Sequence, residues 1–239
     1  MAGWFHNPSP NGRALPPPAE VRAFHAGLPG YAPTPLTELP ALAAELGVGR
    51  VLVKDESDRL GLPAFKVLGA SWAVHRVLAG TEGGLVRLVT ATNGNHGRAV
   101  ARTARLLGHG ALVVVPDGVH PAAVAAIAGE GAEVTAVPGD YDAAVRRAAE
   151  LAAAPGSVLV QDTALPGYEE VPALIVQGYS TLFAEIAEQL PGGADLLVVP
   201  VGVGSLAQAA VTHRGRAAVL AVEPDSAACL LAALDAGRP

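Results

Sequence analysis

Cysteine, lysine, aromatic side chains and long hydrophobic runs are all scarce in this chain of 239 residues. The single cysteine, Cys229, excludes an internal disulfide and suits a reducing compartment, so a cytoplasmic location is expected. No apolar run reaches the ~18 residues of a membrane span, and no secretory signal is visible. The net charge of −6 argues against a nucleic-acid partner. Cys229 itself lies in "SAACLLAAL", which predicts a packed apolar helix.

Only two of the sixteen lysine and arginine residues are lysines, Lys54 and Lys66. A lysine can lose its proton when desolvated and attack a carbonyl carbon, which a guanidinium cannot do. Lys54 lies beside acids in "LVKDESDRL" and is predicted to form an ion pair. Lys66 begins an apolar helix in "FKVLGASWAVHRVLAG", where a cation is costly unless it is neutral or paired. We therefore favour a chemical role for Lys66 over that of a surface lysine.

What the chain does have is an alternation of short apolar runs with alanine-rich helical stretches. The runs are apolar throughout, as strands covered on both faces should be. This alternation predicts an α/β fold of mostly parallel open sheets with helices on both faces. One helix carries three arginines that are expected to form a solvated face: Arg98, Arg102 and Arg105. The predicted strands are 50–54, 85–91, 111–116, 133–138, 157–161, 196–201 and 217–223, and the predicted helices include 95–108, 120–131, 140–154 and 171–190.

Ligands of such folds bind where a strand ends and a helix begins. The turn "TATNGNHG" contains Thr92, Asn93, Gly94, Asn95 and His96, with glycines for tight backbone and helix-start amides that favour a carboxylate. An ordinary strand-to-helix turn explains the same residues equally well, and a packed histidine is the default interpretation of the imidazole.

A second turn, "VGVGSLAQ", places Gly202, Val203, Gly204 and Ser205 between a strand and a helix. Small residues let backbone amides surround a phosphate, and the serine hydroxyl can add a hydrogen bond. The same letters satisfy G-x-G-x-x-A, and Glu223 ends the next strand at the distance that a dinucleotide site requires. An NAD-binding module is therefore one alternative.

Asp162 ends a predicted strand in "VLVQDTALPGYEEVP" and can serve as a general base, although a cap or loop anchor is the simpler role. Pyridoxal phosphate needs an amine that can bond its carbonyl carbon, a turn that binds its phosphate and an amide that can bond its phenolic oxygen. Lys66, residues 202–205 and Asn95 could supply these groups. NAD needs no special lysine, so pyridoxal phosphate fits this set better. No metal site is predicted.

These segments resemble the pyridoxal-phosphate enzymes of the tryptophan-synthase-β type (fold type II), which include threonine dehydratase. Within that family, "QDT…GYEEVP" resembles the diaminopropionate ammonia-lyases. The resemblance implies that Lys66 holds the cofactor and later moves protons, that Phe65 lies against its ring and that Asn95 bonds its phenolic oxygen. It also implies that residues 202–205 grip the phosphate, that residues 92–96 receive the substrate carboxylate and that Asp162 removes the α-proton.

The implied reaction is the α,β-elimination of 2,3-diaminopropionate to pyruvate and ammonia. Asn93 stands where the family usually has an aspartate, so the L-isomer is expected to be favoured through Asp162. Family members also continue beyond "LLAALDAGRP", and no partner for the pyridine nitrogen can be assigned. A serine or threonine dehydratase and a truncated, catalytically impaired relative therefore stay open.

The resemblance also implies two domains. Residues 1–87 with 173–239 are expected to build a large cofactor-binding domain, incomplete at its C-terminus, and residues 88–172 a smaller α/β domain. The expected partners are a small amino-acid substrate and a second copy in a homodimer, with no nucleic acid and no membrane.

Overall fold

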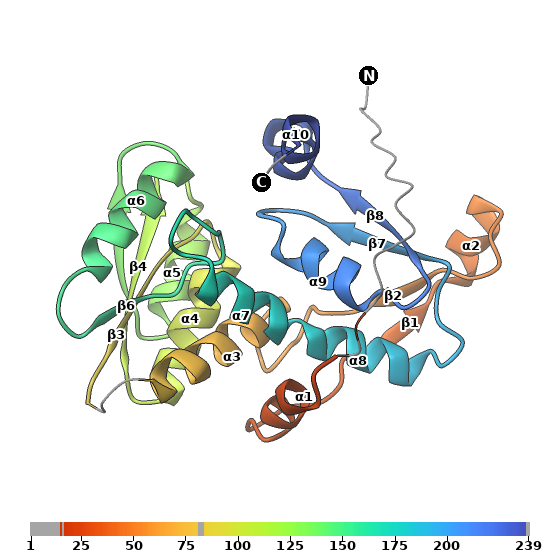
Figure 1. Ribbon diagram of the computed structural model, residues 1–239, viewed down its shortest axis with the longest axis horizontal. Helices are drawn as coiled ribbons and strands as arrows, with labels where there is room; N and C mark the ends of the chain where they lie inside the picture. Colours follow the sequence, from red (N-terminus) through yellow and green to blue (C-terminus); the bar gives the residue numbers. More distant parts are fainter. Residues whose placement is uncertain (1–14, 16, 81–83, 238–239) are drawn as a thin grey trace. The chain divides into compact units, whose positions relative to one another are not determined.

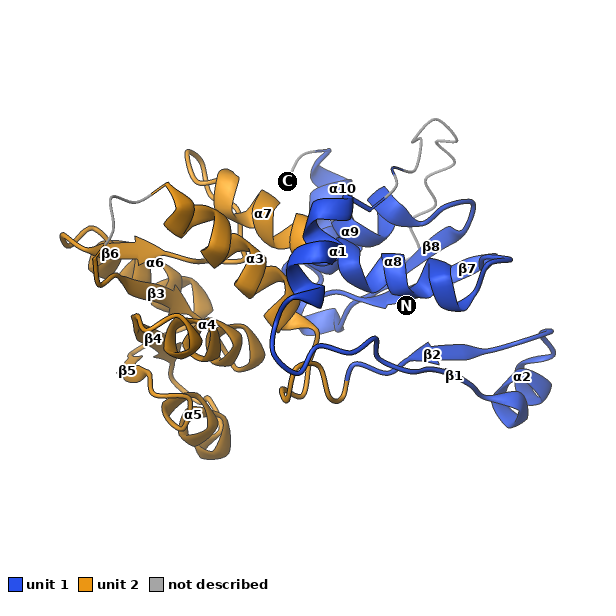
Figure 2. Ribbon diagram, turned by 90° about the horizontal axis from the view of Figure 1, so that it is seen from below, with its two compact units in different colours: residues 1–56, 179–239 blue, residues 57–178 orange. Residues whose placement is uncertain are grey.

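The computed structural model describes Leu15 and residues 17–80 and 84–237. The chain separates into two compact units, one of residues 57–178 and one of residues 1–56 with 179–239 (Figure 2). The predicted smaller domain, residues 88–172, lies within the first unit. That unit also takes in the helix that begins at Lys66, because this helix packs against two later helices of the same unit, Asn95–Leu106 and Glu170–Gly178. The predicted division into domains stays a prediction.

The unit of residues 57–178 is built around a four-stranded parallel sheet with strand order β5-β4-β3-β6 (Figure 1). The strands are apolar because both faces of the sheet are covered. Leu88 contributes to a cluster with α4 side chains, whereas the next residue, Val89, packs with α6 side chains on the opposite face. The strands are β3 (Arg87–Ala91), β4 (Gly110–Pro116), β5 (Glu133–Val137) and β6 (Ser157–Leu159), and the helices between them are α4 (Asn95–Leu106), α5 (Pro121–Ala128) and α6 (Tyr141–Ala152).

Two further helices of this unit, α3 (Lys66–Ala79) and α7 (Glu170–Gly178), pack closely together. Gly178 makes this approach possible, because a Cβ there would lie 2.5 Å from the carbonyl oxygen of Leu68. Val67, Leu68 and Ala70 are buried on α3. The buried face of the helix therefore fixes the position of Lys66 at its first turn.

The other unit contains two small sheets, an antiparallel pair β1-β2 and a parallel pair β7-β8. Helix α9 packs against both strands of the parallel pair. The elements are α1 (Ala19–Ala26), β1 (Leu36–Glu38), α2 (Pro40–Leu46), β2 (Leu52–Lys54), α8 (Ser180–Gln189), β7 (Leu196–Pro200), α9 (Ser205–His213), β8 (Ala218–Val222), the 3-10 helix η1 (Asp225–Ala227) and α10 (Cys229–Ala236).

The predicted α/β class and the helices on both faces of a parallel sheet are confirmed. Three details differ. The predicted strand 50–54 pairs antiparallel with β1, and the predicted helix 171–190 is two helices, α7 and α8, separated after Gly178. Cys229 lies at the start of a helix as predicted, but it is exposed, and α10 buries no residue within the described part of the chain.

The arginine-rich face of α4 is not simply solvated, as the sequence suggested. Arg98, Arg102 and Arg105 converge on the buried carboxylate of Glu130 at 3.2, 2.9 and 3.0 Å. Glu130 follows α5, far from α4 in sequence, so a local pattern contains no sign of it. Hydrogen bonds from Arg102 and Arg98, opposed by burial, hold the pKa of the Glu130 carboxyl below its usual value.

The ion pair predicted for Lys54 is present, with a partner distant in sequence. Lys54 Nζ lies 2.7 Å from Glu185, whose side chain is fully buried on α8. None of the helices in the described ranges is long and apolar enough to span a membrane.

Candidate active site

The strand order places the carboxyl ends of β3 and β6 side by side at a topological switch point. The chain winds from β3 through β4 to β5 on one side of β3, then returns to pair β6 with the other side. In open α/β sheets this is where ligands bind. Residues 92–96 follow β3 and residues 161–162 follow β6, so two segments that the sequence singled out meet at one edge of the sheet.

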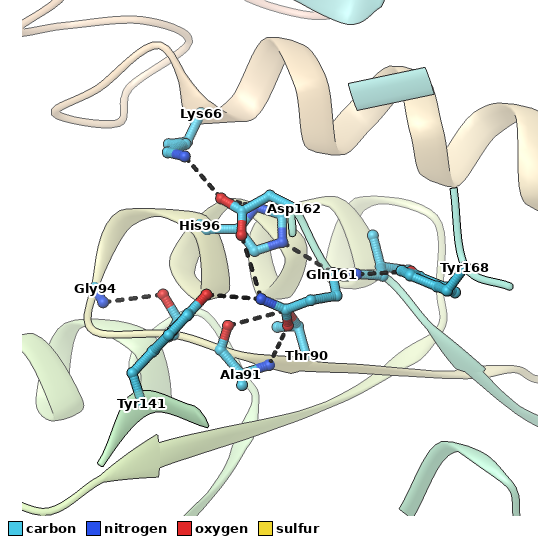
Figure 3. Close-up of polar contacts among 11 residues, drawn as sticks. Lys66, Thr90, Ala91, Gly94, His96, Tyr141, Gln161, Asp162 and Tyr168 are labelled. Atoms are coloured by element: carbon cyan, nitrogen blue, oxygen red, sulfur yellow. Dashed lines mark hydrogen bonds and ion pairs between the residues drawn. The ribbon is translucent and has the colours of Figure 1, made fainter. Parts of the chain in front are cut away.

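Lys66 and Asp162 form an ion pair at this edge (Figure 3). Lys66 Nζ donates to Asp162 Oδ2 at 2.7 Å and lies 5.6 Å from the centre of the Phe65 ring. The Asp162 side chain is 4% exposed and that of Lys66 is 23% exposed, so the amine is reachable and the carboxylate is sheltered. Burial alone would raise the pKa of Asp162, but its electrostatic interactions with His96 and Lys66 and the hydrogen bond from Lys66 hold it below its usual value.

His96 packs beneath this pair from the first turn of α4 (Figure 3). The ring is buried, and its Nε2 donates to the carbonyl oxygen of Val160 at 2.8 Å. Its Nδ1 lies 3.8 Å from Asp162 Oδ2. Burial lowers the pKa of His96, against the attraction of Asp162, so the imidazole is neutral at pH 7. The packed histidine of the sequence interpretation is therefore also a neighbour of the carboxylate.

Gln161 is a residue of this edge that the sequence interpretation missed. Its buried amide oxygen accepts from Ala91 N–H at 2.9 Å and from the Thr90 hydroxyl at 3.1 Å. Its amide nitrogen donates to the Tyr141 hydroxyl at 2.8 Å and to Asp162 Oδ1 at 3.3 Å. Gln161 therefore joins β3, α6 and the carboxylate. The only sequence signal was a polar residue immediately before Asp162 at the end of an apolar strand.

Two tyrosines complete the surroundings. The Tyr168 hydroxyl accepts from Gln161 N–H and donates to the carbonyl oxygen of Leu159, both at 2.9 Å. Burial raises the pKa of Tyr168, and burial together with the Asp162 charge raises the pKa of Tyr141 to about 12. Both phenols are therefore neutral hydrogen-bonding groups at physiological pH. Tyr168 belongs to the "GYEEVP" segment, whose role the sequence alone did not give.

The loop before α4 is held by Thr92, whose buried hydroxyl accepts from Gly94 N–H at 3.0 Å. Gly97 allows the helix to pack onto this threonine, because a Cβ there would lie 2.4 Å from Thr92 Cγ2. Asn93 and Asn95 are exposed. Asn93 also borders a cavity of about 390 Å³ at the same end of the sheet, lined on its other side by the loop after β4 and the start of α6.

The predicted phosphate turn, Gly202–Ser205, lies in the other compact unit, so its geometry is described within that unit. It connects β7 to the nine-residue helix α9, with Gly204 in a left-handed conformation at φ 94°. A Cβ at Gly202 or Gly204 would meet nothing within 4 Å, so the space before the helix is open. The N-cap residue of α9 is Gly204, which makes no side-chain capping hydrogen bond to the first turn.

The structure gives Glu223 a role other than binding a ribose. Its carboxylate accepts from Leu230 N–H at 2.8 Å and Leu231 N–H at 2.9 Å, which caps α10. Cys229 Sγ donates to the carbonyl oxygen of Gly202 at 2.9 Å. The carboxylate that the NAD alternative needs is therefore engaged in local structure.

A model of the family described as "Pyridoxal-phosphate dependent enzyme" matches residues 28–239. The chain belongs to this family. It is 40% identical over 252 residues to the diaminopropionate ammonia-lyase of Salmonella typhimurium, a match that covers 92% of the chain and 62% of that protein. The chain thus spans about three fifths of the length of this relative.

Two further comparisons agree with this placement. The crystal structure of the holo diaminopropionate ammonia-lyase of Escherichia coli superposes with a TM-score of 0.86 at 35% identity, covering 92% of the chain and 63% of that protein. The biosynthetic L-threonine dehydratase of Escherichia coli is 34% identical over 212 residues, covering 86% of the chain and 38% of its own length.

The residues present fit pyridoxal phosphate. Lys66 offers a reachable amine beside a carboxylate that can accept its proton. The turn of residues 202–205 offers open space beside its glycines and the buried Ser205 at a helix start, which suit a phosphate. Among the described residues no cluster of three or more His, Cys, Asp and Glu side chains is placed to hold a metal ion.

Proposed function

We propose that this chain eliminates ammonia from 2,3-diaminopropionate, with Lys66 as the residue that holds pyridoxal phosphate. One diaminopropionate and one water give one pyruvate and two ammonia molecules. When bound, pyridoxal phosphate supplies the electron sink that makes the α-proton of an amino acid removable. The observation that carries the proposal is the 2.7 Å pair between the Lys66 amine and the sheltered Asp162 carboxylate. The 40% identity to a diaminopropionate ammonia-lyase supports the choice of substrate.

In this proposal each residue has the role that its position in the site allows. Asp162 removes the α-proton, since its pKa below the usual range keeps it ionised at neutral pH. Gln161 orients this carboxylate through its Oδ1 atom. The backbone of Thr92–His96 receives the substrate carboxylate, Asn95 bonds the phenolic oxygen of the cofactor, and Phe65 lies against its ring. Gly202, Val203, Gly204 and Ser205 bind the phosphate.

The L-isomer is the proposed substrate enantiomer. A base must lie on the face of the substrate that carries the α-proton, and the two enantiomers present that proton to opposite faces. Asp162 supplies one carboxylate, whereas Asn93 at the end of β3 has an amide that cannot accept a proton. The chain should therefore lack a base for the D-isomer.

The test is pyruvate production by the purified chain with added pyridoxal phosphate and either enantiomer. L-2,3-diaminopropionate should be consumed, and Asp162→Asn should reduce kcat by about 10²–10⁴-fold, as expected for loss of a general base. Asn93→Asp should add turnover of the D-isomer while leaving the L-isomer active. Undiminished turnover of D-2,3-diaminopropionate by the unaltered chain would refute the assignment of the enantiomer.

A dehydratase of serine or threonine is the second candidate, supported by the 34% identity to L-threonine dehydratase. The same assay decides between the two when L-serine and L-threonine replace the diamine. A kcat/KM for either hydroxy amino acid above that for L-2,3-diaminopropionate would favour the dehydratase. No turnover of any of them would favour a catalytically impaired relative.

A further inference from the structure

The two nitrogens of the His96 ring have different environments. Nε2 lies 2.8 Å from the carbonyl oxygen of Val160, which can only accept, so Nε2 carries the proton. In the neutral ring Nδ1 then carries no proton, and its lone pair can only accept a hydrogen bond. That atom is buried and has no hydrogen-bond partner within the described part of the chain. The charged atom facing it is Asp162 Oδ2 at 3.8 Å.

Nδ1 and Oδ2 are therefore two acceptors that face one another with no proton between them. A buried acceptor without a donor costs free energy, and native structures rarely retain one without a reason. Oδ2 already accepts from Lys66, so Nδ1 is the atom that lacks a donor, and one additional proton on Asp162 would supply it. Such a proton is what a general base acquires when it acts.

We propose that His96 Nδ1 and Asp162 Oδ2 share the proton that Asp162 takes from the substrate, so that His96 is a positioning residue of the reaction. This inference rests on the proposed function. The Cα–H bond breaks and its proton bonds to Oδ2, while the electron pair moves toward the Cα–Cβ bond. The β-ammonium group leaves as ammonia with the electron pair of the Cβ–N bond. The O–H group on Asp162 then donates to Nδ1.

Lys66 competes with His96 for the same oxygen. Oδ2 lies 2.7 Å from Lys66 Nζ and 3.8 Å from Nδ1, so the carboxylate is turned toward the amine in this structure. An approach of about 1 Å would bring Oδ2 within hydrogen-bond distance of Nδ1. The other oxygen, Asp162 Oδ1, accepts a long 3.3 Å hydrogen bond from Gln161.

The charge on His96 is set by groups from two neighbouring elements. Lys66 faces it from the start of α3 and Asp162 from the segment after β6. Tyr141 of α6 stays neutral near pH 7, since its pKa is raised to about 12. Replacing Lys66 alone therefore isolates the pair formed by His96 and Asp162.

The first test uses the unloaded chain and does not depend on activity. We would record ¹⁵N NMR spectra of histidine-labelled Lys66→Met at pH 7 and compare them with Lys66→Met/Asp162→Leu. The proposal expects Nδ1 of His96 to move toward its protonated position in the first variant and to be a bare nitrogen in the second. Equal Nδ1 shifts in the two variants would overturn it, whatever the substrate of the enzyme proves to be.

The second test separates proton sharing from packing. His96→Asn keeps a polar atom near the Nδ1 position, whereas His96→Gln keeps one near Nε2, where it can still bond Val160. The proposal expects His96→Gln to lose about tenfold in kcat and to displace the acidic limb of the pH profile, with His96→Asn less affected. This loss is smaller than the 10²–10⁴-fold expected for removing the base itself. The opposite order would assign His96 a purely structural role through Val160.

Discussion

Gln161→Leu should destabilise the unit of residues 57–178 and loosen the Asp162 carboxylate. Leucine has a similar volume but can neither accept nor donate. The change removes the acceptor of Ala91 N–H and Thr90 Oγ1 and the donor to Tyr141 and Asp162. Ala91 ends β3 beyond the last residue of β6, so its N–H depends on this side chain rather than on the sheet.

The size of the effect follows from which groups lose their partner. The buried N–H of Ala91 loses its acceptor, and the Tyr141 phenol loses one donor, whereas Thr90 retains a contact with the Ala91 carbonyl at 3.3 Å. An unsatisfied buried polar group costs about 1–3 kcal/mol. The added apolar contacts of leucine offset part of this. We expect a loss of about 2–4 kcal/mol in the free energy of unfolding.

Urea unfolding followed by the fluorescence of Trp72 measures this loss, because Trp72 is buried within the same unit. Trp4→Phe in every variant leaves Trp72 as the single reporter. The matched control is Gln208→Leu, the same substitution at an exposed position of α9, which should change stability by less than about 0.5 kcal/mol. A loss for Gln161→Leu no larger than the control would refute the reasoning.

Three other perturbations test the packing and the charges. Gly178→Ala should lower the free energy of unfolding by about 2 kcal/mol, because its Cβ would lie 2.5 Å from the Leu68 carbonyl oxygen. Overpacking costs about 3 kcal/mol, and the higher helix propensity of alanine returns about 1 kcal/mol. Thermal melting measures the difference. Lys54→Met should cost about 3–5 kcal/mol in urea unfolding, because it removes the ammonium 2.7 Å from the buried Glu185 carboxylate. Asp162 stabilises the fold at pH values above its unfolded pKa of 3.8, because its folded pKa is lower. This stabilisation should be lost as the pH falls through the folded pKa. In Asp162→Asn the free energy of unfolding should therefore fall less steeply as the pH is lowered.

The first two of these have a control at a less constrained position. Gly110→Ala introduces a Cβ 3.9 Å from the nearest atom, an ordinary contact, and Arg50→Met removes an exposed pair with Glu38. Both should change stability by less than about 1 kcal/mol. Losses of stability in the controls as large as those in Gly178→Ala and Lys54→Met would contradict the packing and ion-pair arguments. An unchanged pH dependence of stability in Asp162→Asn would contradict the argument from the pKa of Asp162.

The parallel sheet of residues 57–178 was predictable because its strands are short apolar runs separated by helical periods. The strands β3, β5 and β6 lie within predicted ranges, and β4 begins one residue before its predicted range, 111–116. The strand β1 and the helices α1 and α2 were not predicted, because their three to eight residues are too short for a periodic pattern.

Residues of the candidate site could be predicted from the sequence where their chemistry or position was unusual. Lys66 stood out as one of two lysines, and Asp162 as an acid that ends an apolar strand. Gln161 was not predicted, because its function depends on partners from β3 and α6 that only the fold brings together. The convergence of three arginines on Glu130 was missed for the same reason. The arginines are neighbours on α4, but Glu130, the acid that they share, lies after α5.

The most direct test of the account is the covalent attachment of pyridoxal phosphate to Lys66. The purified chain is mixed with the cofactor, its visible absorption spectrum is recorded beside that of Lys66→Ala, and borohydride reduction is followed by peptide mass analysis. The account predicts an absorption band of lysine-bound cofactor that is absent from Lys66→Ala, with the label on the Lys66 peptide and none on that of Lys54, the other lysine of the chain. A folded chain without the band, or a band that survives Lys66→Ala, would contradict it.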